Sequence, residues 1–325
     1  MAFKFIDYNR PGKGVKKENK ENYGIGKFFS LTKDNIWRLI SVNIFYVFCN
    51  LPVFFLLYGL SGNLNVPFQT PATLSYQAIN GIFLNDATPS VFSMWNFGAR
   101  LATSGYASTA AWVCFGIGAL VFFTFGFSNV GMACITRNFA RRTPADLAGD
   151  FFGTMKRNWK QALPLGFVDL LAGLALSFDV VYFYYNSLNS GAFVPLLFLF
   201  VSLYIGVTYM MMRFYMYTMV VTFDLKLTKI LKNAFLFSML GFKRNLMAIL
   251  GIVLLLVLNV TLFMVITPIG ALMPLLISFA LGAFIANYAA YPNIKKFMID
   301  PYYEQNPQPQ EEHEEALFSD DVSAE

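Results

Sequence analysis

Residues 246–291 read LMAILGIVLLLVLNVTLFMVITPIGALMPLLISFALGAFIANYAAY and contain no Asp, Glu, Lys, Arg or His. As a single α-helix this stretch would extend about 69 Å at 1.5 Å per residue, roughly twice the ~30 Å hydrocarbon core of a bilayer. The chain must therefore fold back within it. Thr267-Pro268-Ile269-Gly270 is the predicted turn, because proline removes a helix donor and glycine tolerates turn conformations.

The rest of the chain has the same character. Of its 325 residues 56% are hydrophobic and 13% are charged, whereas soluble domains carry roughly 25% charged residues. A bilayer crossing takes about 20 mostly apolar residues. Six segments meet this requirement: 37–60, 110–135, 162–185, 193–221, 246–267 and 270–291. The sequence thus predicts an all-α polytopic membrane bundle of six transmembrane helices.

Basic residues are concentrated in alternate connections. Eight Lys or Arg precede residue 36, six lie between the second and third spans, five between the fourth and fifth, and two follow the sixth. The other three connections together hold only Arg100. Because Lys and Arg near span ends stay in the cytoplasm, both termini are predicted to be cytoplasmic. The net charge of +5 is explained by topology, so we expect a lipid bilayer and no nucleic acid as partner.

A short pattern, Lys-x-Asn, stands before three of the spans. Its residues, with the adjacent arginines, form the candidate cytoplasmic interface: Lys33, Asn35, Lys156, Arg157, Asn158, Lys243, Arg244 and Asn245. Each copy follows amphipathic sequence, so the chain reads as three tandem hairpins, each led by a helix lying in the cytoplasmic interface. Membrane anchoring is the plainer interpretation of these steps, and docking of a partner is the alternative.

The amphipathic pattern is clearest before the second and third copies. In 146–158, Leu147, Phe151 and Met155 recur every four residues, and Thr143-Pro144-Ala145-Asp146 predicts the helix start through an N-cap and an N1 proline. In 227–241 an apolar stripe lies opposite Lys229 and Lys232. The first copy, 25–36, is weaker. We expect the stripes to face the headgroup boundary.

Three full charges fall well inside the predicted spans: Asp169, Asp179 and Arg213. Each costs about 2.5–3.5 kcal/mol at a helix centre on insertion scales, so each needs a partner or water. Asp169 and Arg213 lie at matching depths in adjacent spans, which predicts an ion pair. That pair either fixes helix packing or couples transport to protons or ions. Asp179 lies further out and reaches water at the outer interface or lines an outward-facing site.

Asparagines occupy four positions within the spans: Asn43, Asn50, Asn259 and Asn287. Interhelical hydrogen bonding is the expected role for amides at this depth. Asn50-Leu51-Pro52 also predicts a kink in the first span, because proline cannot donate to the helix ladder.

The predicted organisation has three parts. Residues 1–35 form a basic cytoplasmic tail with an interfacial helix, 36–298 form the membrane domain, and 299–325 form an acidic disordered cytoplasmic tail that holds His313. The outer loop 61–108 is rich in amides and aromatics but has only one acid and one base. It suits a cap over the bundle or a site for a neutral polyol, and argues against a charged substrate.

Sequence patterns for catalysis are missing. The spans hold no histidine, and the chain has no Ser/His/Asp constellation, Walker-type glycine loop or Cys/His cluster with metal-ligand spacing. We therefore expect no enzyme, no catalytic or metal site and no cofactor. An E-A-A…G coupling segment, typical of permease subunits of ATP-driven importers, is absent as well.

Four stretches carry a family resemblance: DYNRPGKGV (7–15), FTFGFSNVG (123–131), RNFAR with DFF and KRNWKQAL (within 137–163), and YPNIKKFMIDPYY (291–303). In these the chain resembles the YesL-like family of bacterial integral membrane proteins, a domain family of unknown function. The resemblance implies a six-span protein of the Gram-positive cell membrane, with relatives associated with sugar importers and sensor-kinase regulators. It implies no catalytic residues.

Three hypotheses follow from the sequence. The first is an accessory or regulatory membrane subunit beside a carbohydrate importer or sensor kinase. The second is a secondary transporter in which Asp169, Asp179 and Arg213 line a pathway near mid-membrane. The third is a structural membrane scaffold.

Overall fold

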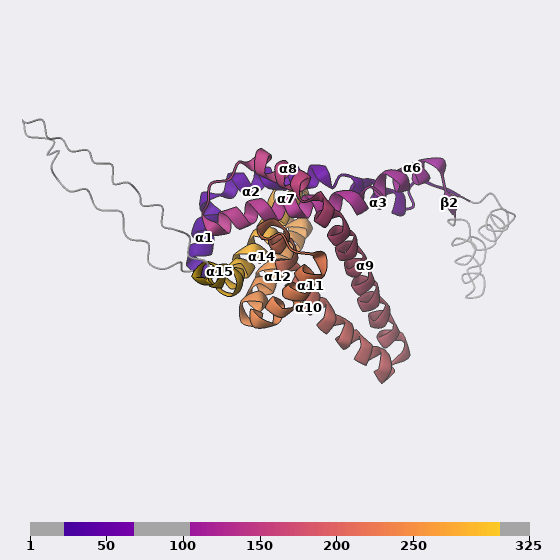
Figure 1. Ribbon diagram of the computed structural model, residues 1–325. Coiled ribbons are helices and arrows are strands. Elements are labelled where there is room, and N and C mark those ends of the chain that lie inside the picture. The colour runs from indigo at the N-terminus through magenta and orange to yellow at the C-terminus, as the bar shows by residue number, and fades with distance from the viewer. Residues whose placement is uncertain (1–22, 68–104, 306–325) are drawn as a thin grey trace, which may run out of the picture.

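The computed structural model describes residues 23–67 and 105–305 and is built almost wholly of helices (Figure 1). Sequence-based expectations for the basic tail before residue 23, for the loop 68–104 with Arg100, and for the acidic tail beyond 305 with His313 lie outside these described residues. The described helices fall into three consecutive units, as the repeated Lys-x-Asn pattern predicts.

The first unit holds α1 (Ile25–Asp34), α2 (Ile36–Cys49), α3 (Pro52–Leu60), α6 (Thr109–Gly118) and α7 (Val121–Arg141). The outer loop is closed at its base by two short antiparallel strands, β1 (Asn65–Pro67) and β2 (Gly105–Ala107), with Val66 opposite Tyr106. The second unit holds α8 (Leu147–Arg157), α9 (Trp159–Ser190) and α10 (Phe193–Thr222).

The third unit begins with α11 (Leu227–Leu240) and α12 (Phe242–Val265). Its returning span is continuous from α13 (Thr267–Met273) through a π-helical turn, η1 (Pro274–Ser278), into α14 (Phe279–Ile294), and it ends in η2 (Lys295–Ile299) and α15 (Asp300–Gln305). The predicted fold-back is confirmed. A Cβ on Gly270 would lie 2.1 Å from the Phe263 backbone nitrogen, so α13 returns directly against α12.

Within the described residues, five helical runs are long and apolar enough to cross a bilayer: Thr109–Arg141, Trp159–Ser190, Phe193–Thr222, Phe242–Val265 and Thr267–Tyr302. The bent pair α2 and α3 makes a sixth if its halves are one span, with 56° between them. The break falls at Asn50-Leu51-Pro52, where the kink is predicted. The chain is thus a multi-pass membrane bundle in which the predicted spans coincide with helices.

Three element boundaries differ from expectation. Helix α8 begins at Leu147 with Asp146 as N-cap, not near Thr143, because the Asp150 carboxylate accepts the Asp146 N–H at 3.1 Å and fixes the first turn there. Helix α9 runs through the expected turn at 186–192 and ends at Ser190, where Gly191 takes a left-handed conformation. Residues 299–305 are helical although a disordered tail is predicted from 299.

The expectation that the stripes of α8 and α11 face the headgroups is also wrong. Phe151 of α8 and Ile230 of α11 are fully buried, packed among side chains of the bundle. Part of each helix stays uncovered, with Phe152 43% and Phe235 48% exposed. The stripes therefore dock the two helices onto the protein, which an amphipathic pattern alone cannot distinguish from docking onto lipid.

One end of the bundle joins all three units, and we call it the basic end: the C-terminal halves of α7, α10 and α14 with the N-terminal halves of α2, α9 and α12. Arg137 of α7 donates to the Val221 carbonyl of α10 at 2.6 Å, and Tyr215 of α10 donates to Asn245 of α12 at 2.7 Å. The hydrophobic core lies here, with Leu39, Ile135, Leu165, Met216 and Ile294 fully buried.

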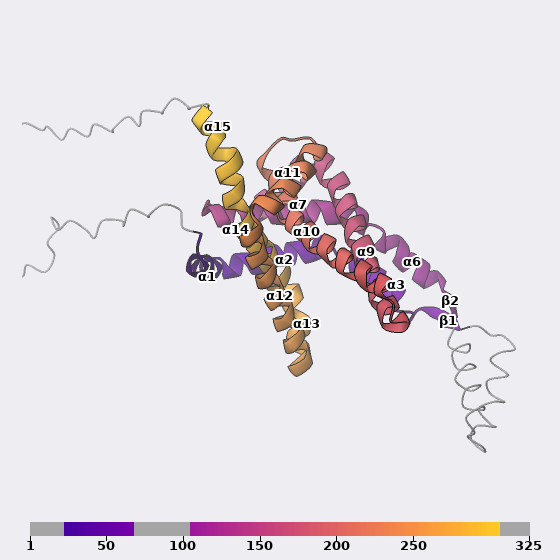
Figure 2. The same cartoon turned by 90° about the horizontal axis from the view of Figure 1, so that it is seen from below.

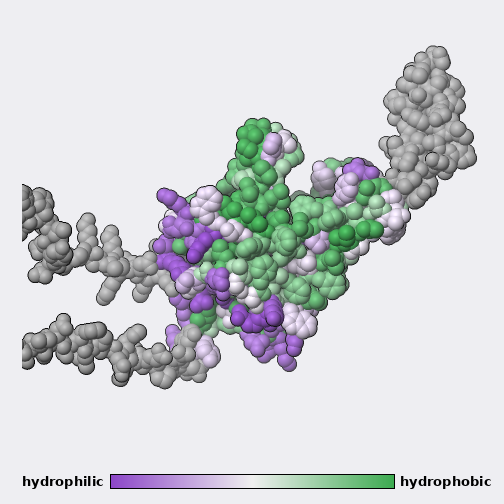
Figure 3. All heavy atoms as spheres, turned by 90° about the horizontal axis from the view of Figure 1, so that it is seen from above, coloured by the Kyte–Doolittle hydropathy of each residue, from purple (hydrophilic) through white to green (hydrophobic). Residues whose placement is uncertain are grey.

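The opposite, far end consists of the tips of the three hairpins: the α3–α6 pair, the α9–α10 turn and the α12–α13 turn. The α9–α10 turn lies apart from the α3–α6 pair in Figure 1, and the α12–α13 turn lies apart from both in Figure 2. Leu60, Phe193 and Met264 are 66%, 72% and 75% exposed. Figure 3 shows hydrophobic residues covering the projecting parts of the molecule, while hydrophilic residues gather toward one side.

Candidate functional site

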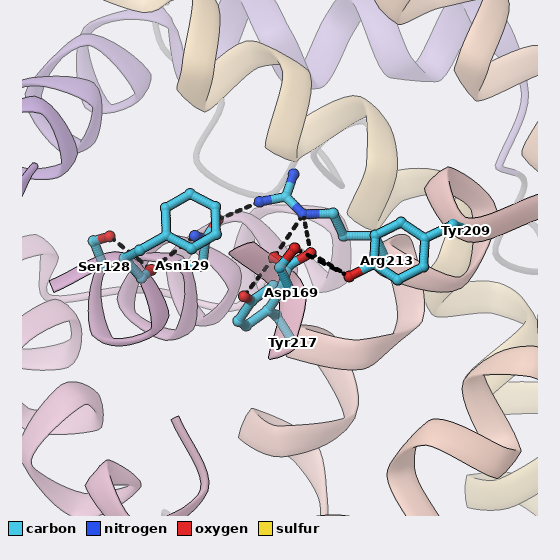
Figure 4. A network of polar contacts seen from close by, with 7 residues as sticks. Ser128, Asn129, Asp169, Tyr209, Arg213 and Tyr217 are labelled. Carbon is cyan, nitrogen blue, oxygen red and sulfur yellow. Dashed lines mark hydrogen bonds and ion pairs between the residues drawn. The ribbon is translucent and has the colours of Figure 1, made fainter. Parts of the chain in front are cut away.

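A polar network inside the spans is centred on Asp169 of α9, a residue that is 3% exposed. The two helices that place its neighbours, α9 and α10, form one hairpin. On α10, Tyr209, Arg213 and Tyr217 recur every four residues and so lie on one helix face. Figure 4 shows these three side chains converging on Asp169.

The predicted Asp169–Arg213 ion pair is confirmed. Arg213 Nε lies 2.8 Å from Asp169 Oδ2 and 3.1 Å from Oδ1. The Tyr209 hydroxyl donates to Oδ1 at 2.7 Å, and the Tyr217 hydroxyl donates to Oδ2 at 2.6 Å. A buried charge is tolerated when it is paired and its remaining lone pairs are hydrogen-bonded, and Asp169 meets both conditions.

The other end of the Arg213 guanidinium reaches the first unit. Its Nη2 donates to Asn129 Oδ1 on α7 at 3.2 Å, and the guanidinium carbon lies 5.5 Å from the ring centre of Phe125. The adjacent Ser128 accepts from Asn50 at the α2–α3 bend at 2.7 Å. Arg213 therefore ties the second hairpin to α7 at a point directly beside the kink of the first span.

A backbone crossing next to this network requires glycine. A Cβ on Gly166 of α9 would lie 2.2 Å from Gly126 Cα on α7, and one on Gly126 would lie 2.1 Å from the Ala162 carbonyl oxygen. Small residues allow membrane helices to approach closely where apolar lipid offers no hydrophobic driving force. The crossing brings Asn129 and Asp169 to opposite ends of the same guanidinium.

A cavity of about 210 Å³ opens on the other side of Arg213, among α2, α7, α10, α12 and α14. Arg213, Asn129, Asn259, Ser278 and Asn287 line it together with a larger number of apolar side chains. Asp169 does not line it. The Arg213 side chain is 36% exposed because it borders the cavity. The Asp169 side chain is only 2% exposed because its carboxylate faces protein.

The four amides expected to bond between helices all do so. Asn50 donates to Ser128, Asn287 donates to Thr136 at 2.6 Å, and Asn259 accepts from Ser278 at 2.9 Å. Asn43 makes the most contacts: it donates to the Pro274 and Leu275 carbonyls at 2.9 and 2.8 Å and accepts from the Ala280 N–H at 2.8 Å. It thus supplies partners to the backbone of the π-helical turn, where the α-helical pattern is interrupted.

Asp179 is not part of this network. It lies ten residues beyond Asp169 on α9, about 15 Å along the helix axis, and is half-buried. Within the described part of the chain no hydrogen bond or ion pair joins it to another residue. The structure therefore brings Asp169 and Arg213 together and leaves the third predicted residue apart.

The Lys-x-Asn steps share a local structure. Asn35 and Asn158 each end an amphipathic helix and donate to the carbonyl four residues earlier, Leu31 at 2.9 Å and Thr154 at 3.0 Å. Asn245 lies one turn into α12 and reaches back to the Ser238 carbonyl at 3.0 Å. Such side-chain donors satisfy the carbonyls left open at a helix end. Asn35 and Asn158 therefore mark the change from amphipathic helix to span, whereas in the third copy this change falls at Gly241, four residues before Asn245.

The cations of these steps differ in burial. Lys33, Lys156, Arg157 and Lys243 are exposed, whereas Arg244 is half-buried. The Arg244 guanidinium donates to the Tyr23 carbonyl at 2.9 Å and lies 5.4 Å from the Tyr23 ring centre. Four of the five cations are thus free to contact lipid headgroups or another protein, and Arg244 fixes the start of α1.

Sequence reasoning missed the two tyrosines around Asp169, the glycine crossing and the cavity. The spacing Tyr209-x₃-Arg213-x₃-Tyr217 was a readable signal, because it places three donors on one face of a helix. The cavity had none, since its lining comes from several helices that lie far apart in sequence. No group of three His, Cys, Asp or Glu residues that could hold a metal ion occurs in residues 23–67 and 105–305.

Comparison with known proteins gives one match. No curated protein and no solved structure matches the chain. A family described as "Protein of unknown function, DUF624" matches residues 107–180, a stretch that holds α6, α7, α8 and the half of α9 bearing Asp169. Over this segment, which includes the glycine crossing and both Asn129 and Asp169, the chain is similar to that family.

Proposed function

We propose that the chain is a non-enzymatic accessory or regulatory subunit of a bacterial cell membrane, with both termini in the cytoplasm. The single observation behind this proposal is that the Asp169 carboxylate is buried and fully hydrogen-bonded. Its two oxygens accept from Arg213, Tyr209 and Tyr217 and are shielded from water. A carboxylate held in this way serves to fix helices to one another, whereas a coupling group must be reached by a proton or an ion.

The partners we propose are subunits of a carbohydrate importer or a sensor kinase. The support is the resemblance to the YesL-like family, to which we assign the match over 107–180. The exposed cations Lys33, Lys156 and Lys243 at the basic end would suit contact with acidic surfaces of such a partner as well as with anionic lipid.

Co-purification tests this function directly. The full-length chain, tagged and expressed at native level, is extracted from its own membranes in a mild detergent, and the co-eluting proteins are identified by mass spectrometry. Importer or kinase subunits should be enriched, and charge reversal of Lys33, Lys156 and Lys243 should reduce their recovery. Recovery of the chain alone would contradict the accessory role and favour a structural scaffold.

The cavity beside Arg213 favours a second candidate, a secondary transporter. A space in the membrane domain whose lining includes a few polar groups is what an occluded substrate site requires. Solute flux into proteoliposomes that is lost in Asp179→Asn, and in Asp169→Asn protein that is still folded, would support it. Flux that survives both substitutions would remove the part played by these carboxylates.

A further inference from the structure

The cavity beside Arg213 contains hydrogen-bond donors that no side chain uses. Arg213 gives its Nε to Asp169 and one Nη2 hydrogen to Asn129. Its Nη1 makes no hydrogen bond within residues 23–67 and 105–305, and Figure 4 shows this nitrogen pointing away from both partners. A guanidinium has five N–H donors in a fixed fork and no acceptor, so the side facing the cavity can only donate.

The lining amides add further polar groups. Each has an oxygen that already accepts from a neighbour: Asn129 from Arg213, Asn259 from Ser278, and Asn287 from Thr218. Each nitrogen donates once, to the Phe125 carbonyl, the Leu255 carbonyl and Thr136 respectively. An amide nitrogen carries two hydrogens and an amide oxygen has two lone pairs, so Asn259 and Asn287 can each still donate once and accept once, while Asn129 also interacts with the Tyr46 hydroxyl. The group that can only donate into the cavity is therefore the Arg213 guanidinium, and the amides around it can donate or accept.

Apart from Tyr46, Tyr217 and Thr218, the remaining wall of the cavity is apolar. It is formed by side chains from α7, α10, α12 and α14: Met132, Ala133, Met210, Ile252, Leu255, Leu256, Ala283 and Ala286. At about 30 Å³ per molecule in the liquid, the volume of 210 Å³ would hold roughly seven waters or one small organic solute. A ligand that fits has an oxygen-rich acceptor group at one end and a compact apolar body.

We infer that this cavity binds a monocarboxylate whose carboxylate meets Nη1 of Arg213 and whose apolar body lies against α12 and α14. Paired hydrogen bonds between guanidinium and carboxylate are among the strongest in proteins. A cation would be repelled by Arg213, and an alcohol would satisfy only part of the donor set. The site is distinct from the accessory role and does not depend on it.

Two sources could provide such a ligand: a short acid from the aqueous phase, or a fatty acid from the bilayer. Titration calorimetry on the full-length chain in nanodiscs of zwitterionic lipid distinguishes them. Hexanoate is the short acid, and palmitate at low mole fraction in the disc is the long one. Hexanol and hexylammonium, which match hexanoate in length, are the controls for the carboxylate.

The binding site is located with two glycine variants. Gly282 on α14 lines the cavity, and a Cβ there would have Leu255 Cδ2 as its nearest neighbour at 4.0 Å. Gly282→Leu therefore fills the cavity without meeting the backbone. Gly173 on α9 has nothing within 4 Å of its Cβ position and does not line the cavity, so Gly173→Leu is the matched control.

We expect hexanoate to bind at least 10-fold more tightly than hexanol and hexylammonium not to bind. Gly282→Leu should weaken hexanoate at least 10-fold, and Gly173→Leu should leave it unchanged. Competition by palmitate identifies the bilayer as the source, and lack of competition identifies the aqueous phase. Equal affinity for hexanoate and hexanol in the unmodified chain overturns the inference without reference to any variant, and so does hexanoate binding that Gly282→Leu leaves intact.

Discussion

The two ends of the same helices differ sharply in how they are held. On α9, Leu165 near the basic end is fully buried and Phe178 toward the far end is 67% exposed; on α10, Met216 and Tyr204 differ in the same way, at 0% and 70%. The basic end is joined by hydrogen bonds between buried polar groups, whereas the hairpin tips diverge. Because apolar surface gains nothing by leaving lipid for protein, packing in a membrane depends on such specific contacts.

We expect polar contacts to stabilise the basic end and to contribute little at the hairpin tips. Asp169→Asn and Asp179→Asn make the same change on one helix, ten residues apart. Asp169→Asn removes the partner charge of Arg213, and breaking a buried pair costs about 3 kcal/mol or more. Asp179→Asn touches no partner within the described residues and should change the free energy of unfolding by less than about 0.5 kcal/mol. Unfolding by SDS in mixed micelles measures the free energy of unfolding of both variants. Equal losses would contradict the different roles given to the two ends of α9.

Glycine substitutions probe close packing in the same way. Gly166→Ala places a Cβ 2.2 Å from Gly126 Cα, so α7 and α9 must separate. We expect a loss of about 2 kcal/mol, typical of overpacking. Gly173→Ala, two turns further along α9 with nothing within 4 Å, should be neutral or slightly stabilising, because alanine favours helix over glycine. The same unfolding assay applies, and a neutral Gly166→Ala would show that the crossing is looser than the structure has it.

Asparagines give the smallest contrast. Asn43→Ala leaves the buried Ala280 N–H without its acceptor and two carbonyls without a donor, so we expect about 1–2 kcal/mol. Asn186 near the tip of α9 donates only to the Tyr182 carbonyl of its own helix, at 2.8 Å and in an exposed position. Asn186→Ala should therefore stay within about 0.5 kcal/mol. Hydrogen exchange of the 274–280 backbone is the more direct readout, and unchanged protection in Asn43→Ala would contradict the role given to this side chain.

Much of the basic end could be predicted from sequence because its signals are local. Uncharged runs predict spans, Asn50-Leu51-Pro52 predicts the bend, and matching depths predict the Asp169–Arg213 pair. The start of α8 was missed because the Asp150 carboxylate accepts the Asp146 N–H and so fixes the first turn at Leu147. The docking of the α8 and α11 stripes on protein could not be predicted from periodicity. An amphipathic pattern indicates that one helix face is covered, but it does not indicate whether lipid or protein covers it.

Contacts between segments that lie far apart in the sequence could not be predicted. Asn43 serves a π-helical turn more than 200 residues away, and Gly126 contacts Gly166 only because α7 and α9 cross there. The cavity depends on several helices at once. Such features follow from tertiary packing. A single sequence shows which residue types are present, but it does not show which distant residues come into contact.

We infer that all three Lys-x-Asn steps lie on one side of the membrane and all three hairpin tips on the other. Cys49, Cys114 and Cys134 are replaced by alanine, and single cysteines are placed at exposed positions: 33, 156 and 243 at the steps, and 61, 190 and 267 at the tips. Whole cells are treated with a membrane-impermeant maleimide before and after permeabilisation.

We expect cysteines 61, 190 and 267 to react in intact cells, and cysteines 33, 156 and 243 to react only after permeabilisation. A single step cysteine that reacts together with the tip group, or a single tip cysteine that reacts with the step group, would contradict it.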